Sequence, residues 1–205
     1  MDSRTIETAY GPVHAQTAGT GPAAIFLHGR HPPLNNWRVW EANLNAVVSS
    51  GFRAVALELP GYGDLARPEG GISTESAVDC VLDLFDRLAI SRTTIVGHHW
   101  GGLLAWRAAL IDSKRITQLV LVAPEGGEQI GDTLPGKLLL PTLILWANGD
   151  PYFSAVHAAA FASAIPNSIQ HIFEASAGQP DNARQAPQLL GAQFNEVLIP
   201  FLKEG

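Results

Sequence analysis

The segment Gly97-His98-His99-Trp100-Gly101-Gly102 constrains the fold more than any other part of this chain. It follows a short apolar run at residues 93–96 and leads into an apolar stretch of helical composition. A strand that passes through a glycine-framed turn directly into a helix is the layout of a nucleophile elbow, which projects one side chain from a strained turn. The central position holds His99, where a serine, aspartate or cysteine is expected. The motif therefore predicts a fold and leaves the chemistry to be argued from the surrounding residues.

The composition predicts one globular domain over residues 1–205, because 46% of the residues are hydrophobic and only 16% are charged. A net charge of -6 without a basic block argues against binding to nucleic acids or to membrane surfaces. Cys80 is the only cysteine, which excludes an internal disulfide. The first residues lack a signal-peptide profile and no apolar run approaches bilayer length, so we expect a cytoplasmic protein.

Short apolar runs alternate with amphipathic segments along the chain, which predicts an α/β fold with a mostly parallel central sheet and helices on both faces. The first two strands flank Tyr10-Gly11-Pro12 and are expected to form an antiparallel pair. Functional residues in such sheets follow the carboxyl ends of the strands. We expect strands at residues 5–8, 13–17, 23–27, 52–57, 93–96, 118–123, 143–147 and 168–173, and helices at 37–49, 74–88, 101–112 and 186–201.

Several motifs in the right order give the chain a resemblance to the α/β-hydrolase superfamily along nearly its whole length. The elbow is most similar to the branch of epoxide hydrolases and haloalkane dehalogenases, which has aspartate at the position of His99. The resemblance implies the α/β-hydrolase fold. Besides the elbow, the matching segments are Phe26-Leu27-His28-Gly29, Leu57-Glu58-Leu59-Pro60-Gly61-Tyr62-Gly63, Leu121-Val122-Ala123-Pro124 and Gly149-Asp150-Pro151.

Two departures from the family pattern bear on function. Only residues 124–140 separate two predicted strands where many members carry a helical lid, so the chain resembles the small members without a lid domain and we expect an open, shallow site. The family's catalytic histidine is replaced by Gln179, whereas the acid position is retained as Asp150. The resemblance further implies an oxyanion hole formed by the backbone N–H groups of Trp100 and Arg30.

The residues at these positions limit the reactions that the site can catalyse. An amide cannot accept the proton that a triad base removes, so Gln179 excludes the standard mechanism. A mostly neutral imidazole at His99 can attack an activated ester or act as a general base, with Asp150 orienting it. We expect Arg30 and His31 to face the substrate, and Glu125 is an alternative acid.

Three interpretations of His99 stay open: a reacting group, a non-catalytic residue of an impaired site, and a metal ligand with Asp150 and His31. No ligand-spaced metal motif is present, and we expect neither a metal nor a cofactor. The main hypothesis is a hydrolase that acts on a small ester or related electrophile. The alternative is a pseudoenzyme that binds a ligand or a protein. A third possibility is that His99 or Gln179 is an engineered substitution in a catalytically competent parent protein.

Overall fold

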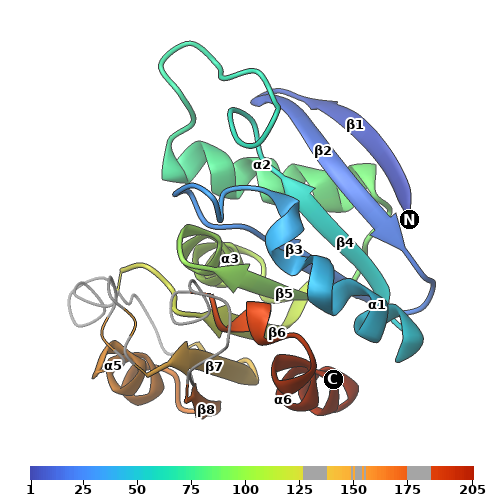
Figure 1. Cartoon of the computed structure of the whole chain (residues 1–205). Helices are drawn as coiled ribbons and strands as arrows, with labels where there is room; N and C mark the ends of the chain where they lie inside the picture. Colours follow the sequence, from blue (N-terminus) through green and yellow to red (C-terminus); the bar gives the residue numbers. More distant parts are fainter. Residues whose placement is uncertain (127–137, 149, 151–153, 155, 175–185) are drawn as a thin grey trace.

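A computed structural model describes residues 1–126, 138–148, 150, 154, 156–174 and 186–205. Within these residues, eight strands form one sheet in the order β1-β2-β4-β3-β5-β6-β7-β8 (Figure 1). The strands are β1 Asp2–Thr8, β2 Gly11–Ala18, β3 Ala23–Leu27, β4 Arg53–Glu58, β5 Thr93–His98, β6 Ile116–Val122, β7 Thr142–Ala147 and β8 Ser168–Phe173. The helices are α1 Glu41–Ser49, α2 Thr74–Arg87, α3 Trp100–Ile111, α5 Val156–Ala164 and α6 Ala192–Lys203, with 3₁₀ turns at Trp37–Trp40 and Pro187–Leu190.

The strand directions confirm the predicted mixed sheet with a parallel majority. β1 pairs with β2 and β2 with β4 in antiparallel register, whereas every neighbouring pair from β4 across to β8 is parallel. The carboxyl ends of the parallel strands therefore meet at one edge of the sheet. The segments after β3, β4, β5, β6 and β7 are brought together at this edge.

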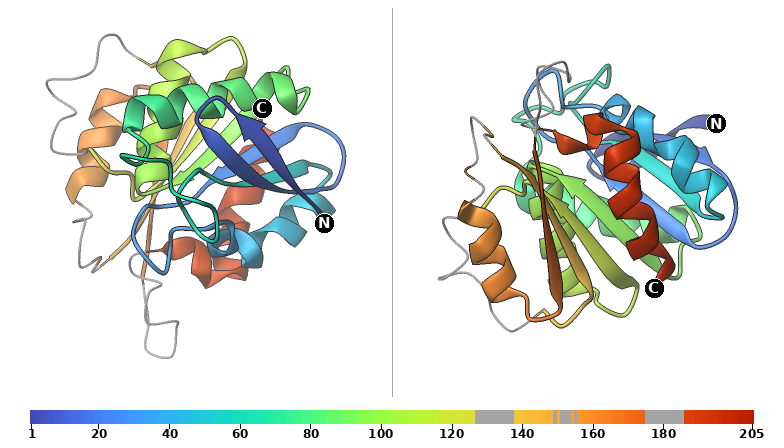
Figure 2. Two further views of the ribbon diagram at one scale, coloured as in Figure 1. Left: turned by 90° about the horizontal axis from the view of Figure 1, so that it is seen from above. Right: turned by 60° about the horizontal axis from the view of Figure 1, so that its bottom comes forward.

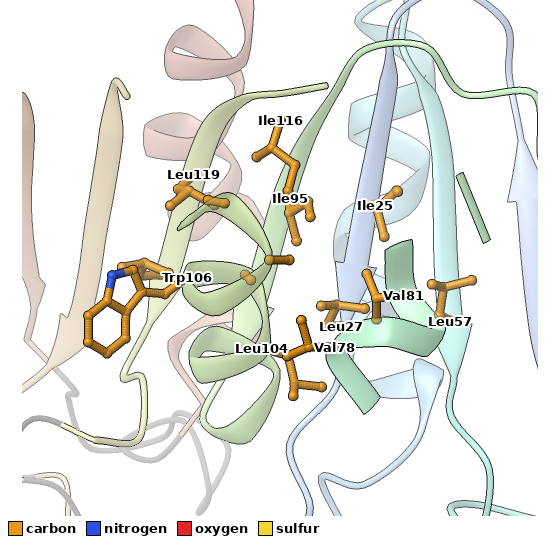
Figure 3. Close-up of a cluster of buried hydrophobic side chains, with 14 of the residues drawn as sticks. Ile25, Leu27, Leu57, Val78, Val81, Ile95, Leu104, Trp106, Ile116 and Leu119 are labelled. Atoms are coloured by element: carbon orange, nitrogen blue, oxygen red, sulfur yellow. The ribbon is translucent and has the colours of Figure 1, made fainter. Parts of the chain in front are cut away.

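Helices cover both faces of the sheet, as the sequence predicts (Figure 2). Ile25 and Leu27 of β3 pack in one core with α2, α3 and α5, whereas Ala24 and Phe26 pack on the other face with α1 and α6. Figure 3 shows the first of these cores, in which Leu104 of α3 lies among side chains of α2 and the central strands. This alternation follows from the two-residue repeat of a strand and leaves the central strands buried on both sides.

Three helices differ from the sequence-based prediction. The segment expected as one helix over 37–49 begins with a 3₁₀ turn, capped by the Asn36 side chain, which accepts from the N–H of Arg38. The closing helix expected over 186–201 is divided at Gly191, whose φ of 56° interrupts helical geometry. Helix α5 was not predicted at all. Helix α2 is capped by Ser73, whose hydroxyl accepts from the N–H of Ser76.

The connection between β6 and β7 is short, since β6 ends at Val122 and β7 begins at Thr142. A stretch of this length has no room for an inserted lid domain. None of the helices in the described part of the chain has the length and apolar content needed to cross a lipid bilayer.

Candidate active site

The predicted elbow is present at the carboxyl end of the central strand β5. His99 is the residue before α3 and adopts φ 48° and ψ -114°, a conformation that few residues other than glycine accept without strain. Backbone hydrogen bonds hold it there: its N–H donates to the carbonyl of Val122 at 3.0 Å, and its carbonyl accepts from the N–H of Glu125 at 3.1 Å. The loop after β6 therefore fixes the strained turn.

The elbow glycines are required by close backbone contacts. A Cβ on Gly101 would lie 2.5 Å from the carbonyl oxygen of Leu27 and 2.6 Å from that of His28. A Cβ on Gly97 would collide with the backbone of Gly101, and one on Gly102 would lie 2.8 Å from the side chain of Pro124. Only glycine lets the first turn of α3 approach the ends of β3 and β5 this closely.

The His99 side chain is buried, with 3% of its surface exposed. Its ring stacks on that of fully buried His98 at a centroid separation of 3.9 Å, and a Cβ on Gly29 would touch the Cβ of His99 at 3.4 Å. The open, shallow site expected from the lidless sequence stays a prediction, because the burial of one side chain does not define the shape of a site. Among the described residues, His98 and Gly29 lie against the His99 side chain.

Two backbone N–H groups beside the elbow are available as donors. Trp100 is the first residue of α3, where N–H groups have no partner within the helix. In the described part of the chain, neither the N–H of Trp100 nor that of Arg30 donates to a protein acceptor. The Trp100 indole is buried, and its Nε1 donates to the hydroxyl of Thr74 at 3.2 Å.

An ion pair joins the loops that follow β3 and β6. Arg30 donates from Nε to Glu125 Oε1 at 3.2 Å, and its Nη2 lies 2.7 Å from Oε2. The Glu125 side chain is 7% exposed and that of Arg30 is 47% exposed. The carboxylate that sequence reasoning offered as an alternative acid is thus held by a guanidinium. The planar two-point contact also fixes the loop whose N–H supports His99.

Tyr62 is a site residue that sequence reasoning missed. Its ring lies 5.2 Å from the ring of His28 and 5.1 Å from that of Trp100, so it packs beside the elbow from the loop after β4. Burial raises the pKa of the Tyr62 phenol, while the nearby positive charges of Arg30 and Arg67 oppose that rise. The only sequence signal was its place in the segment after a predicted strand.

His28 has a structural role in the loops beside the elbow. It is fully buried, its Nδ1 lies 2.6 Å from the carbonyl of Gly29, and its Nε2 accepts from the N–H of Leu59 at 3.1 Å. These partners place the proton on Nδ1 and link the loops after β3 and β4. Burial lowers the pKa of His28 to about 4, against a smaller opposing effect of the Gly29 hydrogen bond.

Three further residues that the sequence predicted for the site are Asp150, His31 and Gln179. Asp150 is half-buried and follows β7, so it lies at the same carboxyl edge of the sheet as His99. Strand β6 lies between β5, which precedes His99, and β7. A contact between the two side chains stays a prediction. His31 is exposed. Gln179 lies outside the described residues. Among the residues that the structure describes, no three His, Cys, Asp or Glu side chains are grouped to hold a metal ion.

Comparison with known proteins supports a common origin over most of the chain. A family model described as the alpha/beta hydrolase family matches residues 24–201. The chain is 36% identical over 122 residues to epoxide hydrolase 2 of Siraitia grosvenorii, covering 58% of this chain and 38% of that protein. It is 31% identical over 106 residues to bifunctional epoxide hydrolase 2 of Sus scrofa, covering 51% of this chain and 19% of that protein. The chain thus spans well under half the length of these curated relatives.

Solved structures match the fold over the whole chain. A hydrolase described as CIB-like from Thermoplasma acidophilum superposes with a TM-score of 0.83 at 21% identity, covering 100% of this chain and 98% of that one. Epoxide hydrolase VrEH1 from Vigna radiata gives a TM-score of 0.78 at 19% identity, with coverage of 100% and 98%. At this identity the likeness concerns the fold.

Replacing Gly101 with alanine tests the close contact at the elbow. Because the added Cβ meets two carbonyl oxygens, we expect Gly101→Ala to lower the free energy of unfolding by at least about 2 kcal/mol. The control is Gly51→Ala, at φ 91° with open space around it, where only backbone strain of about 1 kcal/mol is expected. Urea unfolding measures both. An equal decrease in the free energy of unfolding for the two variants would show that Gly101 is not tightly packed against the carbonyl oxygens of Leu27 and His28.

The buried His28 predicts a pH dependence of stability. Its pKa is about 4 in the folded chain and about 6.5 when unfolded, so between these values the unfolded chain binds more protons. The stabilisation is complete above about pH 6.5 and is lost as the pH falls towards 4, amounting to roughly 3 kcal/mol. Urea unfolding from pH 7 to pH 4 should therefore have a weaker pH dependence in His28→Gln than in the parent chain. An equal pH dependence of the free energy of unfolding in His28→Gln and in the parent chain would contradict a lowered pKa of His28.

Proposed function

This chain belongs to the alpha/beta hydrolase family, and we propose that it hydrolyses small esters at a site centred on His99. The observation that carries the proposal is the position of His99 at the elbow, in the strained conformation that ends β5 and begins α3. The elbow is maintained by glycine contacts that tolerate no side chain. The elbow lies at the carboxyl edge of the sheet, where proteins of this architecture bind their substrates.

The chemistry needs no group beyond imidazole and water. A ring nitrogen of neutral His99 attacks the ester carbonyl, and the alcohol leaves with a proton, which gives an acyl-imidazole. Water then attacks the acyl carbon, releases the carboxylic acid and regenerates the imidazole. The N–H groups of Trp100 and Arg30 would stabilise the oxyanion of both tetrahedral intermediates, which is usually a large part of such catalysis.

Asp150 and Gln179 complete the proposed site. Asp150 would accept a hydrogen bond from the His99 ring and set its tautomer, as an acid does in a triad. Gln179 cannot remove a proton from water and would serve as a hydrogen-bonding group only. Because Gln179 cannot act as the base, we expect slow turnover that is best with activated esters.

A binding protein without turnover is the second candidate. The nearly complete burial of His99 favours it, because a substrate carbonyl must reach a ring that is 3% exposed. In that case the pocket would retain a ligand or a partner protein without forming an adduct. The two candidates differ in whether product accumulates beyond one equivalent.

Steady-state hydrolysis of 4-nitrophenyl acetate tests the proposal. We expect His99→Ala to lower kcat/KM by at least about a hundredfold, because the reacting group is lost. Asp150→Asn should lower it by roughly tenfold through the lost orientation of the ring. The control is His14→Gln, since His14 lies on β2 with Ser3 and Gln16 as its partners, away from the elbow.

A rate that survives in His99→Ala would reject His99 as the reacting group. Saturable ligand binding without multiple turnovers in the parent chain would favour the binding protein. A similar loss in His14→Gln would point to a general effect on folding instead of chemistry.

A further inference from the structure

A hollow of about 470 Å³ opens beside the elbow, between the loops that follow β3 and β4. It adjoins the proposed site through two residues already placed there, Arg30 and Tyr62. In the part of the chain that the structure describes, its lining contains two arginines and no acidic residue, although the whole chain has a net charge of -6. The hollow is lined by Arg30, Asn35, Pro60, Tyr62, Arg67 and Ile72, together with Pro32 and Gly61.

Arg67 is exposed and lies along the loop that follows β4. Its stem packs on Gly61, where a Cβ would lie 3.1 Å from the Arg67 Cγ, and its guanidinium packs on Gly71, where a Cβ would lie 3.3 Å from Nη2. A tight turn in which the N–H of Gly71 donates to the carbonyl of Pro68 supports this arrangement. Arg67 forms no ion pair with any carboxylate of the described residues. An exposed arginine without a carboxylate partner among the described residues therefore lines the hollow.

The Arg30 side chain also has N–H donors that its ion pair does not use. Its ion pair with Glu125 uses Nε and Nη2, which leaves the two hydrogens of Nη1 on the half-exposed side chain. The charge of Glu125 offsets that of Arg30, so the hollow retains the net positive charge of Arg67. The pKa of Tyr62 responds to both arginines, which indicates that the two guanidinium groups lie within electrostatic reach of its phenol.

We propose that this hollow is a carboxylate subsite, in which Arg67 and the free Nη1 of Arg30 hold an anionic end of the substrate. Planar guanidinium groups match the two oxygens of a carboxylate, and Pro60 and Ile72 supply apolar walls for a short carbon chain. The inference rests on the proposed ester hydrolysis and names its substrate class: an ester with a carboxylate several bonds from the reacting carbonyl. Such a substrate places its carbonyl at His99 and its anion in the hollow.

Two esters of matched length test the subsite: 4-nitrophenyl hemiglutarate, which carries a carboxylate, and 4-nitrophenyl valerate, which does not. In the parent chain we expect a lower KM for the hemiglutarate. Arg67→Gln should raise that KM by roughly tenfold, with kcat and the valerate KM unchanged, since a charge-assisted contact is lost only for the anion. Arg67→Lys should give an intermediate KM because it retains the charge without the planar contact.

The matched control is Arg92→Gln. It removes the same charge from an exposed arginine that precedes β5, at the opposite edge of the sheet. This variant should leave both KM values unchanged. Equal effects of Arg67→Gln and Arg92→Gln would attribute the preference to overall charge and overturn the subsite, as would equal KM values for the two esters.

Calorimetric binding of monomethyl glutarate and of dimethyl glutarate separates failure of the subsite from failure of the proposed function. Binding of the monoester alone, weakened by Arg67→Gln, supports the subsite even if no ester is turned over. Turnover of both esters without preferential binding of the monoester would retain the hydrolase and reject the subsite.

Discussion

The contact between the first turn of α3 and the end of β3 is the constraint on which the rest of the structure depends. Gly101 lies against the carbonyl oxygens of Leu27 and His28 with no space for a side chain. Because the helix begins this close to the strand, the residue before it must take the strained conformation of His99. The same approach sets the N–H groups of the helix N-terminus next to the loop that carries Arg30.

The loops at the carboxyl edge stabilise this turn from two sides. The Arg30–Glu125 ion pair spans the loops after β3 and β6, and the backbone of Glu125 holds the carbonyl of His99. His28 and Tyr62 then connect the loop after β4 to the same centre. The site is therefore fixed by backbone contacts and neighbouring side chains.

The sequence predicted the parts of the fold that follow from local patterns. All eight strands and the elbow were predicted, because short apolar runs and paired glycines have few other structural solutions. Helix α5 was missed because its alanine-rich, evenly apolar sequence has no amphipathic period, and the break at Gly191 depends on a local φ. The Arg30–Glu125 pair could not be predicted, since it depends on which strands lie side by side. The burial of His99 was not predicted, because it depends on how side chains distant in the sequence pack around the elbow.

In the proposed mechanism, the His99 imidazole is the group that reacts with the ester. The most direct measurement is rapid-quench mass spectrometry during turnover of 4-nitrophenyl acetate, with peptide mapping of any acetylated residue. We expect transient acetylation of the peptide that contains His99, and no acetylation of this peptide in His99→Ala. Acetylation at another residue during turnover, or turnover without any adduct at this peptide, would contradict this mechanism.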